Sequence, residues 1–109
     1  MSYSVKSTEV FERQTKRLTK KYASLKAELL ALVKELKENP HQGTALGKNC
    51  YKIRLASKSK GKGKSGGARV ITNFVVTNEV VYLLSIYDKS DKENLTDKEL
   101  DELLMFVPD

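Results

Sequence analysis

Residues 68–87 read ARVITNFVVTNEVVYLLSIY and contain two runs rich in β-branched and aromatic residues. Thr77-Asn78-Glu79, which lies between the runs, has the composition of a turn. Two β-rich runs separated by a short polar stretch are typical of a β-hairpin. We therefore predict strands over residues 68–76 and 80–87, paired with each other, and we expect this hairpin to form the centre of the fold.

A third strand is predicted just upstream, where Cys50-Tyr51-Lys52-Ile53-Arg54-Leu55-Ala56 alternates apolar and basic residues. A period of two puts Tyr51, Ile53 and Leu55 on one face and Lys52 and Arg54 on the other. Residues 57–67 consist of four lysines, four glycines and three serines. That composition cannot build a core and predicts a flexible loop. Residues 41–49, which include two glycines, are expected to be a connector.

The N-terminal part of the chain is predicted to contain a short strand and two helices. Residues 3–6 have the pattern of the strand, and Ser7 or Thr8 can cap the first helix with its hydroxyl. The second helix is expected over residues 24–38, because leucines recur there at helical spacing and Asn39-Pro40 ends the pattern. We expect the two helices to form a hairpin that covers one face of the sheet.

The C-terminal part begins a helix at Thr96-Asp97-Lys98-Glu99, which has the capping-box pattern. Strands and helices in this order predict an α+β fold with a small, mainly antiparallel sheet. The N-terminal helical hairpin lies on one face, and the short helix closes the chain. With 109 residues and no internal repeat, the chain is expected to form a single domain over residues 1–109.

The net charge of +6 is unevenly distributed. Residues 48–69 hold eight lysines and arginines and no acid, whereas residues 88–102 hold seven acids against three lysines. A basic region of this kind attracts phosphate. The plainer interpretation is a lysine-rich, solvated loop. The single cysteine and an N-terminus without an apolar stretch predict a cytoplasmic protein that does not engage a membrane.

Several kinds of site are excluded by the residues available. No group of His, Cys or acidic residues has metal-ligand spacing, so no metal or cofactor is expected. His41 is the only histidine and follows a proline that ends a helix, which makes it a surface residue rather than a general base. Cys50, at the start of a strand, is interpreted as a small core residue rather than a nucleophile.

The remaining candidates are basic and aromatic residues on the sheet face opposite the helices. Alternation puts Ser85, Tyr87 and Lys89 on one face of the last strand, opposite Leu84 and Ile86. An exposed patch is therefore expected to gather Lys52, Arg54, Arg69, Tyr87 and Lys89. Arginine binds phosphate with fixed charge, and lysine or tyrosine can exchange a proton. Cleavage of RNA through its 2′-hydroxyl needs these groups and no metal, although basic side chains on a sheet also serve solubility or plain RNA binding.

Three segments together resemble a known family. Tyr51-Lys52-Ile53-Arg54-Leu55-Ala56-Ser57-Lys58 resembles the second strand of RelE-like toxins. A lysine- and glycine-rich loop then leads into Ser65-Gly66-Gly67-Ala68-Arg69-Val70-Ile71, and Val81-Tyr82-Leu83-Leu84-Ser85-Ile86-Tyr87-Asp88-Lys89 follows as the second arm of the hairpin. The order is similar to the RelE/ParE superfamily of type II toxins, and most of all to its HigB-like branch.

The resemblance implies a toxin that enters the ribosomal A site, cuts mRNA there, and is held inactive by a cognate antitoxin. Carried over by position, the family's cleavage residues fall on Lys52, Arg54, Arg69 and Lys89. The tyrosine that RelE carries near its C-terminus has no clear counterpart here. The matching place falls near Leu95, and Tyr87 is the candidate substitute.

The sequence leaves three functions open. The first is a metal-independent, ribosome-dependent mRNA endoribonuclease, in which the loop lysines bind RNA (Lys58, Lys60, Lys62 and Lys64). The second is a ParE-like gyrase inhibitor on the same fold, and the basic residues of the sheet argue against it. The third is a non-catalytic regulator that binds nucleic acid through the same lysines.

Overall fold

The computed structural model describes residues 3–55, 67–89 and 94–108. The regular elements in these ranges follow the order expected from the sequence, with one additional strand. They are β1 (Ser4–Ser7), α1 (Glu9–Lys21), α2 (Leu25–Glu38), β2 (Thr44–Gly47), β3 (Cys50–Leu55), β4 (Ala68–Val75), a 3-10 turn (Val76–Asn78), β5 (Val80–Asp88) and α3 (Asp97–Leu104).

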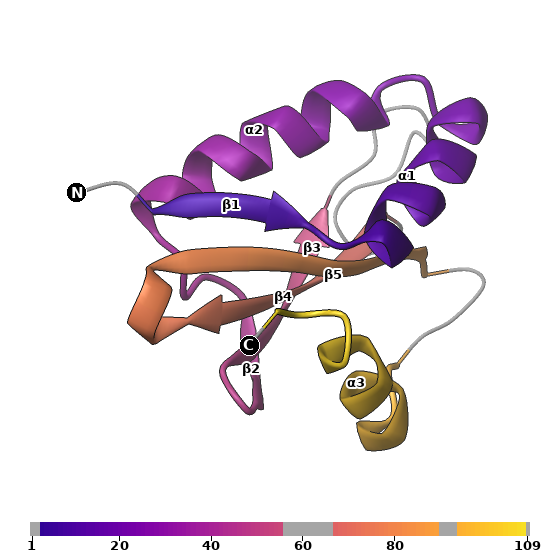
Figure 1. Cartoon of the computed structure of the whole chain (residues 1–109). Helices are drawn as coiled ribbons and strands as arrows, with labels where there is room; N and C mark the ends of the chain where they lie inside the picture. Colours follow the sequence, from indigo (N-terminus) through magenta and orange to yellow (C-terminus); the bar gives the residue numbers. More distant parts are fainter. Residues whose placement is uncertain (1–2, 56–66, 90–93, 109) are drawn as a thin grey trace.

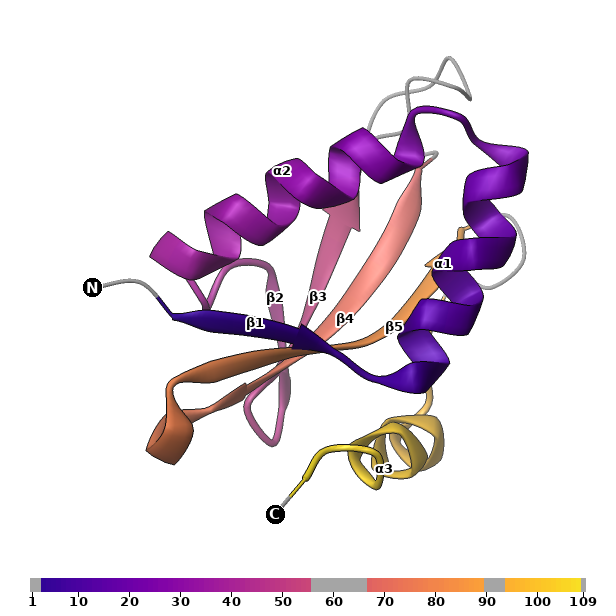
Figure 2. The same ribbon diagram turned by 45° about the horizontal axis from the view of Figure 1, so that its top comes forward.

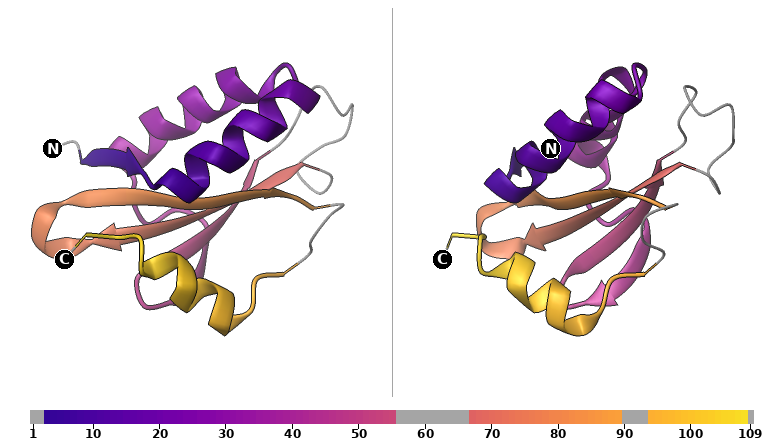
Figure 3. Two further views of the ribbon diagram at one scale, coloured as in Figure 1. Left: turned by 45° about the vertical axis from the view of Figure 1, so that its right-hand side comes forward. Right: turned by 90° about the vertical axis from the view of Figure 1, so that its right-hand side faces the viewer.

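The strands form one twisted sheet in the order β1-β5-β4-β3-β2 (Figures 1 and 2). The pair β1–β5 is parallel, and the other neighbouring pairs are antiparallel. Helices α1 and α2 lie on one side of the sheet and α3 lies on the other (Figure 3). The predicted α+β class, the helical hairpin on one face and the short C-terminal helix are therefore confirmed.

The main core lies between the sheet and helices α1 and α2. Leucines from both helices contribute to it, and Leu36 is completely buried. The sheet contributes alternate residues, such as Val70 and Phe74 of β4 and Val81 and Leu83 of β5. This is the apolar face that the alternation along each strand predicts.

A second, smaller core lies between the sheet and α3. It contains the other set of alternating residues, among them Ile71, Leu84 and Tyr87, together with Leu100 of α3. The hydroxyl of Thr96 accepts a hydrogen bond from Glu99 N, and the Glu99 side chain accepts one from Thr96 N. The capping box therefore fixes where α3 begins, and with it which apolar residues reach the sheet.

The expectation of a connector at residues 41–49 was wrong over residues 44–47, which form the edge strand β2. Lys48 and Asn49 join β2 to β3 with φ values of 55° and 61°, as in a two-residue hairpin turn. Asn73 of β4 donates hydrogen bonds from Nδ2 to the carbonyl oxygens of Lys48 (3.1 Å) and Asn49 (3.3 Å). This support comes from a distant part of the chain, so local sequence could not indicate it.

Candidate functional site

Three of the predicted site residues lie side by side across adjacent strands. Arg54 of β3 pairs with Arg69 of β4, and Arg69 pairs with Tyr87 of β5. Directly paired residues point to the same face, with Cβ atoms roughly 5 Å apart. We call Arg54, Arg69 and Tyr87 the cationic row. It lies on the α3 side, because Tyr87 packs in the core cluster that contains Leu100.

Lys52 and Lys89 flank the cationic row. Lys52 is two residues from Arg54 on the same strand and pairs with Ile71, which belongs to the core cluster under α3. Lys89 follows β5 directly, and its backbone N–H donates to the carbonyl oxygen of Gly67 at 3.3 Å. That bond holds the end of β5 against the start of β4, next to the pair formed by Arg69 and Tyr87.

The register of β5 differs from the simple alternation that the sequence predicted. Thr72 pairs with Leu83 and Ile71 with Ser85, so Leu84 is an extra residue in β5 and forms a β-bulge. Leu84 packs in the same cluster as Tyr87. The expectation that Leu84 lies opposite Tyr87 was therefore wrong, because a bulge shifts the phase of every residue that follows it.

The cationic row is not the open patch that was expected. Arg69 is 4% exposed and Tyr87 is 8% exposed, whereas Arg54 is exposed and Lys52 and Lys89 are half-buried. Packing explains part of this burial, because Tyr87 shares its cluster with Leu100 of α3, and Leu95 packs against the same cluster. Arg54 is thus the member of the row most open to a ligand.

Backbone carbonyls hold the guanidinium of Arg69. Its Nη1 donates to the carbonyl oxygens of Gly67 at 3.4 Å and Ala68 at 3.3 Å. A buried charge is costly unless polar groups compensate for its lost hydration. These contacts provide part of that compensation and restrict the movement of the guanidinium, so Arg69 supplies positive charge at a fixed place.

Tyr87 lies in an environment that favours the neutral phenol. Burial raises the pKa of Tyr87, the neighbouring positive charge of Arg69 opposes that shift, and Glu99 of α3 adds to it. The net direction is upward, so the phenol keeps its proton at neutral pH and above. In this state a tyrosine can donate a hydrogen bond or a proton, but it cannot accept a proton as a base.

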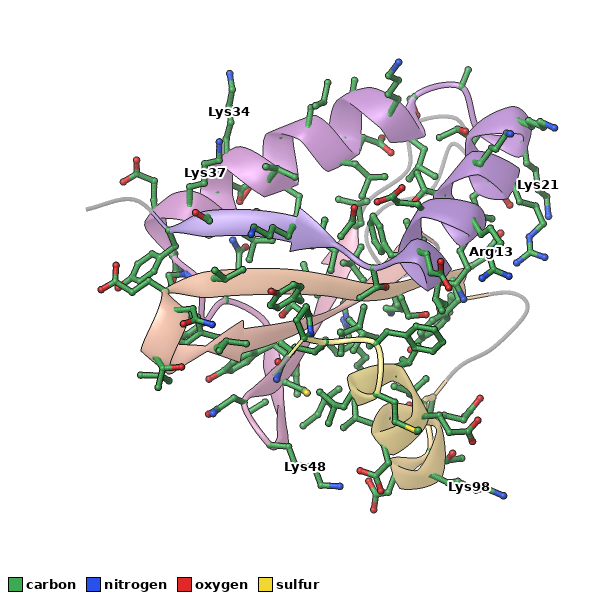
Figure 4. The ribbon with its side chains drawn as sticks, viewed as in Figure 1. Arg13, Lys21, Lys34, Lys37, Lys48 and Lys98 are labelled. Carbon is green, nitrogen blue, oxygen red and sulfur yellow. The ribbon has the colours of Figure 1, made fainter. Side chains whose placement is uncertain are left out.

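Helix α3 is also tied to the β2–β3 turn by an ion pair. Lys48 extends from the turn toward α3 (Figure 4), where its ammonium group contacts the carboxylate of Asp101. The hydrogen bond to Asp101 raises the pKa of Lys48. Both side chains are more than half exposed, so the pair orients α3 but adds little to stability.

Sequence reasoning missed a buried carboxylate beside the site. Asp88, the residue after Tyr87, is 1% exposed and accepts a hydrogen bond from the Tyr22 hydroxyl. Nζ of Lys21 lies 3.9 Å from the same carboxylate. These contacts attach the end of α1 to the end of β5. The sequence offered no signal for them, because Asp88 belongs to an acidic stretch and Tyr22 is distant in the chain.

Some expectations concern residues that the structure does not describe. The loop lysines (Lys58, Lys60, Lys62 and Lys64) lie outside the described residues. Among residues 3–55, 67–89 and 94–108, no three His, Cys, Asp or Glu side chains come together as a metal site requires. No helix in the described part of the chain combines the length and apolar character needed to cross a membrane. Cys50 is buried, as expected of a core residue.

Comparison with known proteins connects this geometry to a family. A family model described as "RelE toxin of RelE / RelB toxin-antitoxin system" matches residues 8–107. A double arginine-to-alanine mutant of the E. coli toxin RelE in the free state is similar, with a TM-score of 0.64 and 21% identity. That match covers 99% of this chain and 100% of that chain. The isolated E. coli RelE toxin matches with a TM-score of 0.63 and 17% identity, over 97% of this chain and 100% of that chain. At these identities the likeness of the structures establishes the fold.

Proposed function

Because the chain belongs to the RelE toxin family, and is therefore the toxin of a toxin–antitoxin system, we propose that it is a metal-independent endoribonuclease. Its substrate is mRNA, which it cuts on the ribosome, and the result is inhibition of translation. Its proposed partners are the ribosome and the mRNA. A cognate antitoxin is a third partner, and membership of the family implies that one. The observation that carries the proposal is the cationic row across three adjacent strands.

The row suits cleavage through the ribose 2′-hydroxyl. In that reaction the 2′-oxygen attacks the adjacent phosphorus and loses its proton, while the 5′-oxygen leaves and gains one. Negative charge grows on the phosphate oxygens in the transition state. Two guanidinium groups on neighbouring strands, Arg54 and Arg69, can stabilise that charge, and Arg69 is already held in place by backbone carbonyls.

Proton transfer falls to the other members of the site. Since Tyr87 keeps its proton at neutral pH, it is suited to protonate the leaving 5′-oxygen or to donate a hydrogen bond to the phosphate. Lys52 and Lys89 flank the row and provide charge or move protons. The loop lysines (Lys58, Lys60, Lys62 and Lys64) bind the RNA backbone, which makes association dependent on salt.

Burial sets the order of these contacts. The exposed Arg54 meets the RNA first, because Arg69 and Tyr87 are 4% and 8% exposed. Side chains that cover the two buried residues must move before one phosphate can touch the whole row. The energy of RNA binding drives this local rearrangement, as substrate binding does in many enzymes.

The direct test is a translation reaction with one reporter mRNA, purified protein, and primer extension to map new RNA ends. We expect cuts inside the coding region, and only when the message is translated. The matched control is Lys37→Ala, because Lys34 and Lys37 point from α2 away from the sheet (Figure 4). This variant should cleave as the unmodified protein does.

Two other outcomes would overturn the proposal. Intact message together with halted DNA replication in cells would indicate the gyrase inhibitor. Binding to an operator by the isolated protein, without growth arrest, would indicate the non-catalytic regulator. Cleavage of the same message without translation would keep the endoribonuclease and remove the requirement for the ribosome.

A further inference from the structure

Strand β5 has a different neighbour along each half of its outer edge. β1 pairs with it only from Val80 to Leu83, where Ser7 is the last partner. Beyond Leu83, no strand of the described residues pairs with this edge. All of β5 is buried, so its backbone N–H and carbonyl groups there need other partners.

Residues of and just before α1 supply those partners. Thr8 donates its N–H to the Leu83 carbonyl oxygen at 3.1 Å, and its hydroxyl lies 3.3 Å from the carbonyl oxygens of both Leu83 and Leu84. Six residues further along the chain, Oε1 of Gln14 accepts hydrogen bonds from Ser85 Oγ and from Ile86 N, each at 3.0 Å. Together, these contacts reach four successive residues of β5.

The four residues include the β-bulge at Leu84. The bulge determines which way Tyr87 points, because side chains of a strand alternate between its faces. Leu83 packs in the core under α1 and α2. In a regular strand, the residue four positions later would point the same way, into that core. With the extra residue, Tyr87 instead points to the α3 side and pairs with Arg69.

We propose that Gln14 is a positioning residue: its side-chain oxygen holds Ile86 N–H and the Ser85 hydroxyl so that the bulge keeps Tyr87 in the cationic row. Gln14 takes the place that a neighbouring strand occupies along the first half of β5. It acts on the reaction through Tyr87 and does not touch the RNA. The catalytic consequence rests on the proposed function, whereas the effect on the geometry of Tyr87 does not.

The plainer role for Gln14 is to satisfy a buried N–H and so stabilise the fold. The two roles differ in what happens to Tyr87. If Gln14 only stabilises the fold, its substitution lowers the unfolding midpoint and leaves the folded molecules unchanged. If Gln14 positions Tyr87, its substitution changes the environment of the Tyr87 phenol in the molecules that remain folded.

The test compares Gln14→Leu, which removes the acceptor at similar size, with Gln14→Glu, which keeps an acceptor oxygen at the same distance along the side chain. Gln42→Leu is the matched control, because Gln42 is also half-buried. Among the described residues, its side chain makes one hydrogen bond, from Nε2 to the carbonyl oxygen of Asn39 at 3.5 Å. Tyrosinate absorbance is followed against pH in each variant, and the signal of Tyr87 is identified by subtracting a Tyr87→Phe background. Cleavage kinetics on ribosome-bound mRNA are measured in parallel.

We expect Gln14→Leu to change the midpoint at which Tyr87 ionises and to lower kcat by about tenfold or more, with KM little changed. Gln14→Glu should restore both, and Gln42→Leu should change neither. Native ionisation of Tyr87 together with an unchanged kcat in a folded Gln14→Leu protein would overturn the proposal. If Gln14→Leu does not fold, Gln14→Asn, which withdraws the amide by one methylene, is judged by the same two criteria.

The ionisation measurement separates this proposal from the proposed function. A changed Tyr87 midpoint in a protein that cuts no RNA at all, even without substitution, would uphold the positioning role and refute the endoribonuclease. The reverse result, with cleavage by the unmodified protein and no effect of Gln14→Leu on either readout, would refute the positioning role alone.

Discussion

Strand β4 is buried on both faces of the sheet, but it carries a charged side chain on only one of them. Under α1 and α2, strand β4 contributes Val70 and Phe74 to a large apolar core. Under α3, the same strand contributes Arg69 and Ile71, and both are almost completely buried. The first face is covered by helices of 13 and 14 residues, and the second by one of 8. The large core can therefore supply the stability that a buried charge on the other face costs.

We predict that substitutions in the core between the sheet and helices α1 and α2 act mainly on folding. Leu36→Ala should lower the free energy of unfolding by about 2–5 kcal/mol, because Leu36 is 0% exposed and its loss leaves a cavity. Urea denaturation measures this effect. Leu30→Ala on the same helix is the control, since Leu30 is 61% exposed and should tolerate the change. Equal effects at the two positions would contradict the assignment of the core.

Substitutions on the α3-covered face should act on cleavage instead. Arg69→Ala is expected to reduce mRNA cleavage by about 10²–10³-fold, because it removes a preorganised charge from the transition state. It should also abolish growth arrest in cells that express it. Arg69→Lys should recover only part of the activity, since an ammonium group cannot reproduce the contacts of a guanidinium. Full toxicity of a well-expressed Arg69→Ala protein would remove Arg69 from the active site.

Tyr87 tests whether a proton donor works beside the arginines. Tyr87→Phe should reduce cleavage by about 10²-fold, near the lower end for the loss of a general acid. The raised pKa of Tyr87 predicts that activity persists to a higher pH than an exposed tyrosine would allow. A rate profile on ribosome-bound mRNA measures both effects. Unchanged activity of Tyr87→Phe would assign proton donation to another group.

The same residue links stability to pH. Because the pKa of Tyr87 is higher in the folded chain than its ordinary value of about 10, the unfolded chain releases this proton first as pH rises. The stabilising effect of the bound proton is therefore complete below about pH 10 and is lost as pH rises through the folded-state pKa. Urea denaturation at pH 9 and pH 11 should show a smaller decrease for Tyr87→Phe than for the unmodified protein. An identical decrease would contradict the burial of the phenol.

The smallest effect is expected at the ion pair between Lys48 and Asp101. Lys48→Ala should leave the urea midpoint almost unchanged, because exposed ion pairs are screened by water and salt. Hydrogen exchange should show slightly faster opening of α3. Lys98→Ala is the control, because Lys98 projects from α3 on the side away from Lys48 (Figure 4), and the ion pair with the β2–β3 turn is made by Lys48. A large loss of stability in Lys48→Ala would mean that the ion pair, rather than the apolar contacts of Leu100, holds α3 on the sheet.

The sequence predicted most of the fold because local patterns determine its main elements. The alternation from Cys50 to Leu55, the leucine spacing of α2 and the capping box at Thr96 are each readable within a few residues. β2 was missed because its hairpin turn depends on Asn73, about 25 residues away in the chain. The register of β5 was misjudged for a similar reason, since contacts from Gln14 accompany the bulge.

The candidate site was predictable in its residue types but not in its burial. Alternation correctly relates Lys52 and Arg54 within β3, and the strand pairing brings Arg54 beside Arg69. The burial of Arg69 and Tyr87 depends on where α3 packs, and no local pattern specifies that. Asp88 and its bond to Tyr22 likewise require the folded chain.

The most direct test of the account is a double-mutant cycle on Arg54 and Arg69, read as single-turnover cleavage of ribosome-bound mRNA. If both guanidinium groups act on one phosphate, the combined Arg54→Ala and Arg69→Ala protein should lose less activity than the product of the two single losses. Losses that multiply independently, or two single variants that cleave normally, would contradict a shared site on the cationic row.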